Sequence, residues 1–336
     1  MLKNIQLQTF DVIILGAGAA GLMAAKSASD RGRKVLILEK SNMPGKKILM
    51  SGGGKCNFTN IDVRPENFIS ENPHFSTSAI SRYEPEDFIY LVNSHGIPFE
   101  ERSHGQLFCK GSSREILDML LTECAANMVH IQTNFETLEV SKYTADSNNH
   151  DPRDMNASGF LVRGVCREKG SEVSVELYSQ SLIVATGGLS IPTLGGSSFG
   201  YKLAKNFGIR STPVFAGLVP FIFADKHLKG LKDLTGVSVE AEITCGNQKF
   251  RESLLFTHKG ISGPVVLQIS NYWNKSDPIY INLFPDKDIE SERNNWILET
   301  PNKLFRSRLK EYLPRSRVSF LEESYWFDYK NTPMKK

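Results

Sequence analysis

A strand, a glycine turn and a helix near the start of the chain constrain its fold more than any other feature. Residues 11–15 are a short apolar run that suits a buried parallel strand. The sequence GAGAAG follows at once, and the alanine-rich residues 22–29 are compatible with a helix. A second strand is expected at residues 34–39, and it ends in Glu39, 18 residues after Gly21. A lone G-x-G-x-x-G is weak evidence, but this strand–helix–strand context predicts an α/β dinucleotide-binding domain.

Each glycine of the turn has its own physical reason. Gly16 permits the tight turn, Gly18 lets a pyrophosphate approach the backbone, and Gly21 lets helix and strand pack closely. The start of the helix offers unpaired N–H groups to the phosphates. Glu39 can accept hydrogen bonds from both ribose hydroxyls, and its charge repels a 2′-phosphate. We therefore expect a bound ADP moiety that lacks this phosphate.

Composition and charge are those of an ordinary globular protein. A chain of 336 residues suggests about two domains, and 23% charged residues is unremarkable for a globular fold. The 40 basic and 37 acidic residues leave a net charge of +3. This surplus is too small and scattered to indicate nucleic acid or an anionic membrane. We expect neither as a partner.

The cysteine pattern favours a reducing compartment. The five cysteines are odd in number and none are at C-x-x-C spacing, so neither a disulfide framework nor a structural zinc site is expected. The histidines form no metal-ligand spacing either. The apolar stretch 12–25 contains three glycines and follows Asp11, which argues against a signal peptide. No apolar run is long enough to span a bilayer. The sequence predicts a cytoplasmic protein that binds no metal.

Residues 51–60 read SGGGKCNFTN, and three consecutive glycines need a physical reason because ordering them costs conformational entropy. A Walker-type phosphate loop requires a glycine five residues before Gly54 and a serine or threonine after Lys55. The chain has leucine and cysteine at those places. Residues 57–60 have turn chemistry. The bare backbone indicates that a ligand approaches closely.

With residues 11–21, the Glu39-Lys40 pair and the sequence GKK at 45–47, this segment resembles the BaiN-like bacterial flavoproteins. These are also described as the aminoacetone oxidase family of NAD(P)/FAD-dependent oxidoreductases. Their hallmark is S-G-G-G-[RK]-C-N-x-T-N. The resemblance implies that the cofactor is FAD and that residues 51–60 cross close to its flavin end.

The resemblance also suggests roles within this loop. Lys55 would offset phosphate charge or stabilise an anionic reduced flavin. Asn57 would bond a carbonyl of the flavin ring or the chain itself. Cys56 has two interpretations, a redox-active thiol beside the flavin or a small buried hydrophobe.

Residues 181–188, SLIVATGG, predict another buried strand that runs into paired glycines, separate from a strand at 173–179. Ser112 and Glu115 form a capping box that predicts the start of a helix. Together these resemble the second half of a two-dinucleotide-binding-domain flavoprotein, in which the A-T-G-G turn passes near FAD. The predicted cofactor-binding residues are Gly16, Gly18, Ala19, Ala20, Gly21, Glu39, Lys40, Lys47, Ser51, Gly52, Gly53, Gly54, Lys55, Cys56, Asn57, Thr186, Gly187 and Gly188.

The sequence changes in character after Thr212. Prolines and short alternating runs predict antiparallel strands, as in a small barrel. Residues 255–264, LFTHKGISGP, match a second hallmark of the family, L-F-T-H-x-G-I-S-G-P. A polar, glycine-rich turn suits a site that faces substrate or flavin. His258 either donates a proton there or holds the turn together.

We expect three parts in all. They are a Rossmann-like FAD-binding domain at 1–210, a β-barrel domain on the substrate side at 211–285, and a helical insertion at 286–336 with a helix over 290–312. Family members then finish with a G-G-Y-N-type segment beneath the flavin ring. This pattern is not found before Lys336. The resemblance is therefore expected to stop near residue 313, within a truncated insertion.

The sequence thus predicts a flavin-dependent oxidoreductase that transfers hydride through flavin N5 to or from a small molecule. A complete second G-x-G-x-x-G is missing, so NAD(P)H is a candidate transient electron donor only. One alternative is an amine oxidase that passes electrons to oxygen, and another is a non-catalytic remnant. A flavin-dependent RNA-modifying enzyme is disfavoured by the near-neutral charge. The oligomeric state is not predicted.

Overall fold

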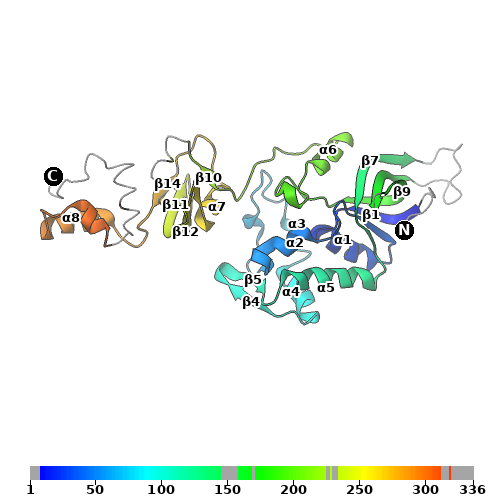
Figure 1. Cartoon of the computed structure of the whole chain (residues 1–336), viewed down its shortest axis with the longest axis horizontal. Helices are drawn as coiled ribbons and strands as arrows, with labels where there is room; N and C mark the ends of the chain where they lie inside the picture. The colour runs from blue at the N-terminus through cyan, green and yellow to red at the C-terminus, as the bar shows by residue number, and fades with distance from the viewer. Residues whose placement is uncertain are drawn as a thin grey trace. The chain divides into compact units, whose positions relative to one another are not determined.

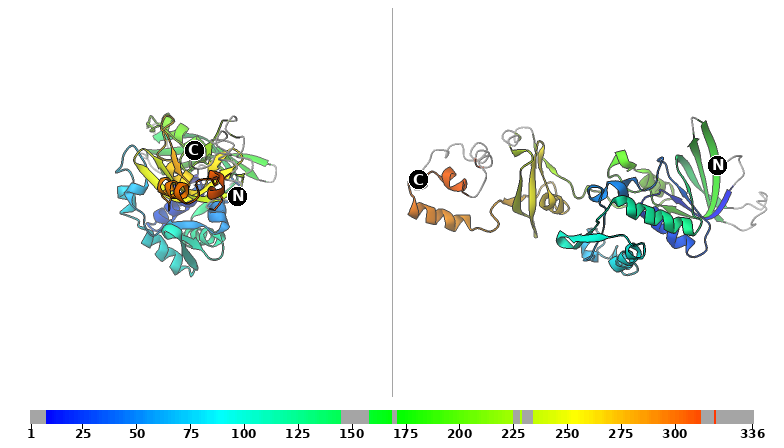
Figure 2. Two further views of the ribbon diagram at one scale, coloured as in Figure 1. Left: turned by 90° about the vertical axis from the view of Figure 1, so that its left-hand side faces the viewer. Right: turned by 60° about the horizontal axis from the view of Figure 1, so that its bottom comes forward.

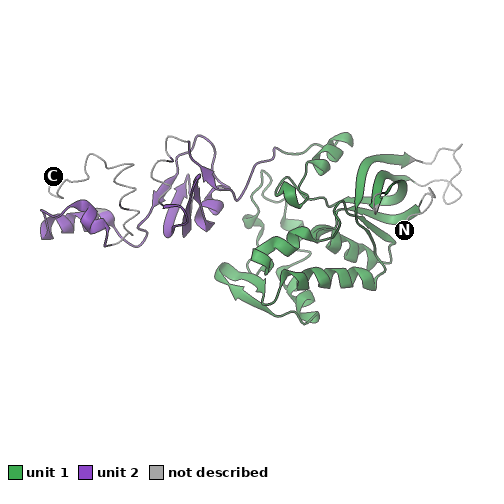
Figure 3. Cartoon of the chain, viewed as in Figure 1, with its two compact units in different colours: residues 1–212 green, residues 213–336 purple. Residues whose placement is uncertain are grey.

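The computed structural model describes residues 8–144, 158–168, 171–224, 228, 234–311 and 318. The chain divides into two compact units, Met1–Thr212 and Pro213–Lys336, which Figure 3 colours separately. The first unit is built on a largely parallel sheet with helices, and the second on an antiparallel sheet.

In the first unit the described strands of the main sheet follow the order β6-β2-β1-β9-β8-β7. Figure 1 labels β1, β9 and β7 of this sheet. Strands β1 (Gln8–Leu15), β2 (Val35–Leu38) and β6 (His130–Gln132) run parallel, and β1 also pairs in parallel with β9 (Ser171–Val184). Their apolar residues are buried, as continuous runs in a covered parallel sheet should be. Because parallel strands share one carboxyl edge, the residues after β1, β2 and β9 lie along the same edge.

Strand β9 differs from the expectation of two separate strands. Its first residues pair antiparallel with β8 (Ser158–Glu168), and its last residues pair in parallel with β1. The sequence pattern along β9 changes from alternating to continuously apolar where its pairing partner changes from β8 to β1. The strand itself is not broken there. Val184 is 44% exposed, so this end is also less buried than predicted. Strand β7 (Phe135–Thr144) pairs with β8 and completes the meander (Figure 2).

Two helices that pack on each other contribute to a shared apolar core. Helix α1 (Ala19–Ser29) follows the glycine turn, and α5 (Ser113–Ala126) packs against it. The predicted capping box of Ser112 and Glu115 is confirmed at the start of α5. Between β2 and the glycine-rich loop lies the short helix α2 (Lys46–Met50), which also contacts α5. The unit further contains α3 (Thr77–Ile80), α4 (Pro85–Ser94) and α6 (Phe199–Asn206).

A small antiparallel sheet, β3-β5-β4, lies in the same unit. It consists of β3 (Asn57–Asn60), β5 (Gln106–Cys109) and β4 (Phe99–Arg102). The expectation of a turn at 57–60 was wrong, because β3 pairs with β5. Phe58 packs against Phe88 and Phe99, with ring centroids 5.9 and 5.5 Å away. These partners, distant in sequence, outweigh the local turn preference of the asparagines.

The second unit has a sheet of order β10-β13-β12-β11-β14. Its antiparallel strands are β10 (Phe221–Ile222), β11 (Ser238–Cys245), β12 (Gln248–Thr257), β13 (Gly260–Ser262) and β14 (Tyr280–Asn282). Helix α7 (Pro264–Ile269) packs against β11 and β12 and buries Val265, Val266 and Ile269.

Helices α8 (Ile289–Glu299) and α9 (Phe305–Leu309) follow in the second unit. The single helix expected over 290–312 is therefore interrupted. Pro301 explains the break, because it disfavours helical backbone at the preceding residue. None of the helices described in either unit is long and apolar enough to cross a membrane.

Candidate functional site

The glycine turn after β1 leaves open space at one glycine and not at the other two. Gly16 has φ of +104°, and a Cβ atom there would lie 2.5 Å from the carbonyl oxygen of Ala185. A Cβ on Gly21 would collide with the carbonyl oxygen of Gly16. Gly18 has φ of −81°, and a Cβ there would meet no atom within 4 Å. The packing of the chain requires Gly16 and Gly21, whereas the space beside Gly18 is available to a ligand.

The N-terminus of helix α1 adjoins this space. Gly18 is its N-cap residue and supplies no side-chain acceptor, and the first turn holds no acidic residue. Ala19 and Ala20 are exposed. The first N–H groups of an 11-residue helix therefore face outward with no side-chain cap, which is the arrangement that binds phosphate groups.

Glu39 links the end of β2 to the glycine turn. Its Oε2 accepts a hydrogen bond of 2.8 Å from the backbone N–H of Ala17, and its Oε1 accepts bonds from the N–H and hydroxyl of Ser41 at 2.8 and 2.7 Å. A carboxylate offers about four lone-pair sites. Three are in use, so one ribose hydroxyl fits without displacing Ser41. Sequence reasoning missed Ser41, although its position two residues after the acid was a signal.

The second glycine turn, Thr186 to Gly188, follows β9 at the same sheet edge. Lys47 of α2 reaches it: Nζ donates a hydrogen bond of 2.9 Å to the carbonyl of Ser190, and a Cβ on Gly187 would lie 3.7 Å from this Nζ. The hydroxyl of Thr186 is buried and has no hydrogen-bond partner within the described chain. An orphaned hydroxyl of this kind indicates a missing polar partner.

The three glycines after Ser51 all have left-handed backbone, with φ of 55°, 65° and 86°. Only glycine adopts this conformation readily in succession. A Cβ on Gly52 would lie 2.7 Å from the backbone nitrogen of Asn57, whereas Gly53 and Gly54 have open space beside them. Gly52 is required by the chain itself, and the backbone of the other two is accessible to a ligand.

Two predicted site lysines hold other parts of the chain. The Nζ of Lys55 donates hydrogen bonds of 2.7 Å to the carbonyls of Lys110 and Gly111, just before α5. Lys40 pairs with Glu136 of β7 at 2.8 Å. Both lysines therefore have structural partners before any ligand is considered.

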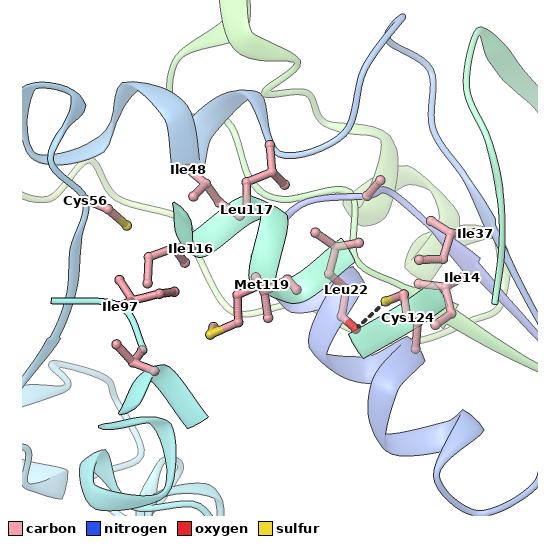
Figure 4. Packing of buried hydrophobic residues seen from close by; sticks show 14 of the residues in the cluster. Ile14, Leu22, Ile37, Ile48, Cys56, Ile97, Ile116, Leu117, Met119 and Cys124 are labelled. Atoms are coloured by element: carbon pink, nitrogen blue, oxygen red, sulfur yellow. Dashed lines mark hydrogen bonds between the residues drawn. The ribbon is translucent and has the colours of Figure 1, made fainter. Parts of the chain in front are cut away.

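Cys56 lies at the end of the buried apolar cluster drawn in Figure 4, and its sulfur points toward that cluster. Its backbone is left-handed, with φ of 51°. Burial raises the pKa of the Cys56 thiol, and a hydrogen bond with Ser51 offsets part of this effect. A thiol kept protonated is a poor nucleophile, so the geometry favours the small buried hydrophobe over the redox-active thiol. Asn57, the first residue of β3, is exposed.

His258 belongs to the second unit, in the two-residue turn between β12 and β13, and it is exposed. Thr257 holds this turn. Its hydroxyl donates to the carbonyl of Gly260 at 3.2 Å and accepts from the N–H of Lys259 at 3.3 Å. The imidazole is thus displayed on a turn that another residue stabilises. Across the described residues, no group of three or more His, Cys, Asp or Glu side chains is arranged to hold a metal ion.

The structure thus brings the glycine turn, Glu39, Lys47 and the Thr186 turn to one edge of the first unit's sheet. Family comparisons agree with this architecture. The HI0933-like protein Rossmann domain matches residues 10–252, and the HI0933-like protein barrel and H2TH domain matches residues 215–336. The chain belongs to the HI0933-like family. The predicted fold class, a Rossmann-like domain with a small barrel domain, is confirmed.

Similar proteins are named either as ribosomal RNA dihydrouridine synthases or as a bile acid reductase. The ribosomal RNA dihydrouridine synthase of Escherichia coli (strain K12) is 44% identical over 94% of this chain and 74% of its own length. The Haemophilus influenzae protein of the same name is 41% identical over 91% of this chain and 72% of its own length. A 3-dehydro-bile acid delta(4,6)-reductase of Clostridium scindens is 28% identical over 83% of this chain and 66% of its own length.

These relatives place the chain among flavoprotein oxidoreductases. The BaiN-like flavoproteins are members of the same family, so the expected resemblance is confirmed at the level of the family. The expectation that it stops near residue 313 was wrong, because the barrel and H2TH match continues to residue 336. The division of the second part into a barrel at 211–285 and an insertion at 286–336 stays a prediction.

Proposed function

We propose that the chain binds FAD along its glycine turn and reduces a carbon–carbon double bond conjugated to a carbonyl, with a uracil base of RNA as substrate. Two relatives' names support this chemistry. Dihydrouridine forms when the C5=C6 bond of uracil, conjugated to the C4 carbonyl, gains two hydrogens. A delta(4,6)-reductase of a 3-dehydro bile acid likewise acts on double bonds conjugated to an oxo group.

The open space beside Gly18 is the observation that carries the cofactor assignment. It lies at an uncapped helix N-terminus that would hold the FAD diphosphate. Glu39 has one acceptor site left for a ribose hydroxyl. The orphaned Thr186 hydroxyl and the bare backbone of Gly53 supply further polar contacts. The residues present therefore fit the group.

When bound, FAD supplies hydride chemistry at N5 of its isoalloxazine ring. The chain's own residues bind and orient. Lys47, fixed by the Ser190 carbonyl, places a positive charge beside Gly187 and stabilises negative charge there. Saturating a conjugated bond also requires a proton at the second carbon. His258 belongs to the second unit, and its predicted role as proton donor stays a prediction.

RNA is preferred to a free small molecule because identity to the RNA-named relatives is higher and extends over more of the chain. The expectation that nucleic acid is not a partner rested on the small, scattered charge surplus and the absence of a basic stripe, and it stays an untested prediction. Our proposal departs from it. NADPH or NADH is the proposed source of reducing equivalents.

The proposal is tested on the purified 336-residue chain. A flavin absorption band, with FAD identified by mass spectrometry after denaturation, would support the cofactor assignment. Unmodified ribosomal RNA transcribed in vitro is then incubated with protein and NADPH without oxygen and digested to nucleosides. We expect nucleosides two hydrogens heavier than uridine, formed only when protein and reductant are both present.

Two outcomes would contradict this substrate. One is a flavin that NADPH bleaches while the RNA stays unmodified and a conjugated 3-oxosteroid is reduced instead, which would favour the small-molecule reductase. The other is anaerobic bleaching by a small amine with no response to NADPH, which would favour an amine oxidase. A colourless protein that takes up no added FAD would contradict the flavoenzyme assignment itself.

A further inference from the structure

The small net charge of the chain conceals an uneven distribution. Residues 40–61 contain four basic residues and no acidic one, and residues 177–212 contain three basic residues and no acidic one. Acidic residues make up 37 of the 336 in the chain, so these 58 residues would hold about six at the average frequency. Surfaces of globular proteins usually mix both signs of charge. Two acid-free segments in one unit therefore indicate a surface that attracts anions.

The structure brings these two segments together at the second glycine turn. Lys47 of the first segment bonds to Ser190 of the second. Helix α6 adjoins the same turn: a Cβ on Gly188 would lie 3.6 Å from the hydroxyl of Tyr201, and one on Gly200 would lie 3.3 Å from Oγ1 of Thr186. The acid-free segments thus form one neighbourhood around the proposed flavin site.

Helix α6 and the residues after it carry three exposed cations, Lys202, Lys205 and Arg210. No ion pair links any of them to an acidic side chain within the described residues. Other exposed cations of the unit, such as Arg31, also have no ion pair in the described part of the chain, but some are neutralised. Arg163 and Arg167, for example, are each paired with two glutamates across the β7–β9 meander. The charge of Lys202, Lys205 and Arg210, which we call the α6 cation surface, is therefore available to a ligand.

This surface extends beyond what one FAD requires. In the proposed site the N-terminus of α1 would hold the diphosphate, and Lys47 would offset negative charge beside Gly187. Lys205 in the last turn of α6 is also favourable for the helix dipole, but that effect does not explain Lys202 or Arg210. Tyr201, 36% exposed and next to these cations, adds the aromatic face that single-stranded nucleic acid uses for stacking.

We propose that the α6 cation surface binds the phosphate backbone of the RNA whose uracil is reduced at the adjoining flavin site. This inference rests on the proposed function and names the face of the first unit that its substrate occupies. Lysine and arginine contacts to phosphate supply affinity and position without reading sequence. Tyr201 directly precedes Lys202, and its hydroxyl adjoins Gly188 of the second glycine turn, so its ring can stack an unpaired base near the flavin.

The test removes the surface without touching the cofactor site. In the 336-residue chain, Lys202, Lys205 and Arg210 are replaced together by alanine. The matched control replaces Arg31, Arg33 and Lys142, which are exposed basic residues of the same unit, and so removes the same charge. Binding of unmodified ribosomal RNA transcribed in vitro is measured at several salt concentrations, together with FAD content and dihydrouridine formation.

We expect the α6 variant to bind this RNA about tenfold more weakly, or worse, at moderate salt. The slope of log affinity against log salt should fall by about 2 units, because three phosphate contacts are lost. FAD content should stay at the wild-type level, which shows that the protein is folded. The control variant should bind RNA as the wild type does.

The outcomes separate this inference from the proposed function. If the wild type forms dihydrouridine and the α6 variant binds and reacts equally well, the surface assignment is overturned and the function stands. If both triple variants weaken binding equally, general charge and not this surface explains it. If the flavin-loaded wild type neither binds nor modifies RNA, the proposed function fails and the surface assignment fails with it.

Discussion

The carboxylate of Glu39, at the end of β2, accepts a hydrogen bond of 2.8 Å from the backbone N–H of Ala17 in the glycine turn. The same carboxylate also holds the N–H and hydroxyl of Ser41. The Glu39 side chain therefore holds both the glycine turn, through Ala17, and the residues after β2, through Ser41. The residue proposed to bind ribose is also part of the structure that shapes the diphosphate site.

We expect Glu39→Ala to weaken FAD binding about 10- to 100-fold, because hydrogen bonds to a charged group contribute about 1.5–3 kcal/mol. The loss of the Ala17 bond should also lower the free energy of unfolding of the apoprotein. Fluorescence titration of apoprotein with FAD measures the first effect. Glu139→Ala is the control, since Glu139 is an exposed carboxylate paired with Arg163 at 3.3 Å. Unchanged FAD affinity in Glu39→Ala would rule out the ribose contact.

The three glycines of the turn should respond differently to alanine. Gly16→Ala and Gly21→Ala force a Cβ against backbone oxygens, so both variants should be strongly destabilised or unfolded. Gly18→Ala meets open space at an ordinary φ, so the apoprotein should melt close to the wild type while FAD binding falls. Melting curves of apoprotein and FAD titration test this. A Gly18→Ala variant with full FAD affinity would show that the cofactor lies elsewhere.

Short sequence patterns predicted those elements of the fold that depend on residues close together in the sequence. The strand–turn–helix at the start of the chain and the capping box at Ser112 depend on residues a few positions apart, and both occur as expected. Strand β3 could not be predicted this way. Its sequence favours a turn, and it becomes a strand only because Phe58 packs against aromatic residues distant in sequence.

The site shows the same limit. The spacing of the motif identified Gly16 and Glu39. It did not predict that the Glu39 carboxylate accepts three hydrogen bonds from nearby residues of the chain itself. Lys55 was predicted to face phosphate or flavin, and it bonds to two carbonyls more than fifty residues away. Such partners depend on how the chain returns to the same edge of the sheet. Net charge likewise concealed the acid-free segments, which become one surface only when α2 and α6 meet at the second glycine turn.

The bond between Lys47 and Ser190 should connect cofactor binding to the order of residues 188–197. Lys47→Met removes the bond and the charge beside Gly187 while keeping most of the side chain's bulk. We expect FAD affinity to fall about 3- to 10-fold, as for loss of one partly exposed charged hydrogen bond. Amide exchange in 188–197 should become faster. Lys46→Met is the matched control; equal effects of the two substitutions would contradict a specific role for Lys47.

Cys56 should behave as a packing residue. Its buried thiol has a pKa raised by burial, so native protein near neutral pH should resist alkylation by iodoacetamide at this position. Cys56→Ala should keep reductase turnover within about twofold of the wild type, at a modest loss of stability from the core cavity. Peptide mass spectrometry after alkylation, with denatured protein as the positive control, provides the measurement. Rapid native alkylation together with loss of turnover in Cys56→Ala would restore the redox-active interpretation.

Two other buried thiols should make stability fall in alkaline solution. Burial is the main cause that raises the pKa of Cys109 and of Cys124, each to about 11 from 9.0. Below about pH 9 both states keep these protons, and the stabilising contribution is complete. Between about pH 9 and 11 the unfolded state loses them first, so the unfolded state binds fewer protons and the free energy of unfolding falls.

The expected contribution is on the order of 1–3 kcal/mol per thiol across this interval. Urea denaturation at a series of pH values measures it. The Cys109→Ala/Cys124→Ala variant should be less stable near neutral pH, because cavities form, yet should lose less stability between pH 9 and 11 than the wild type. Val92→Ala, in the same buried cluster, should lower stability without changing the slope. Parallel curves for wild type and the cysteine variant would show that other groups, such as tyrosines, govern the alkaline transition.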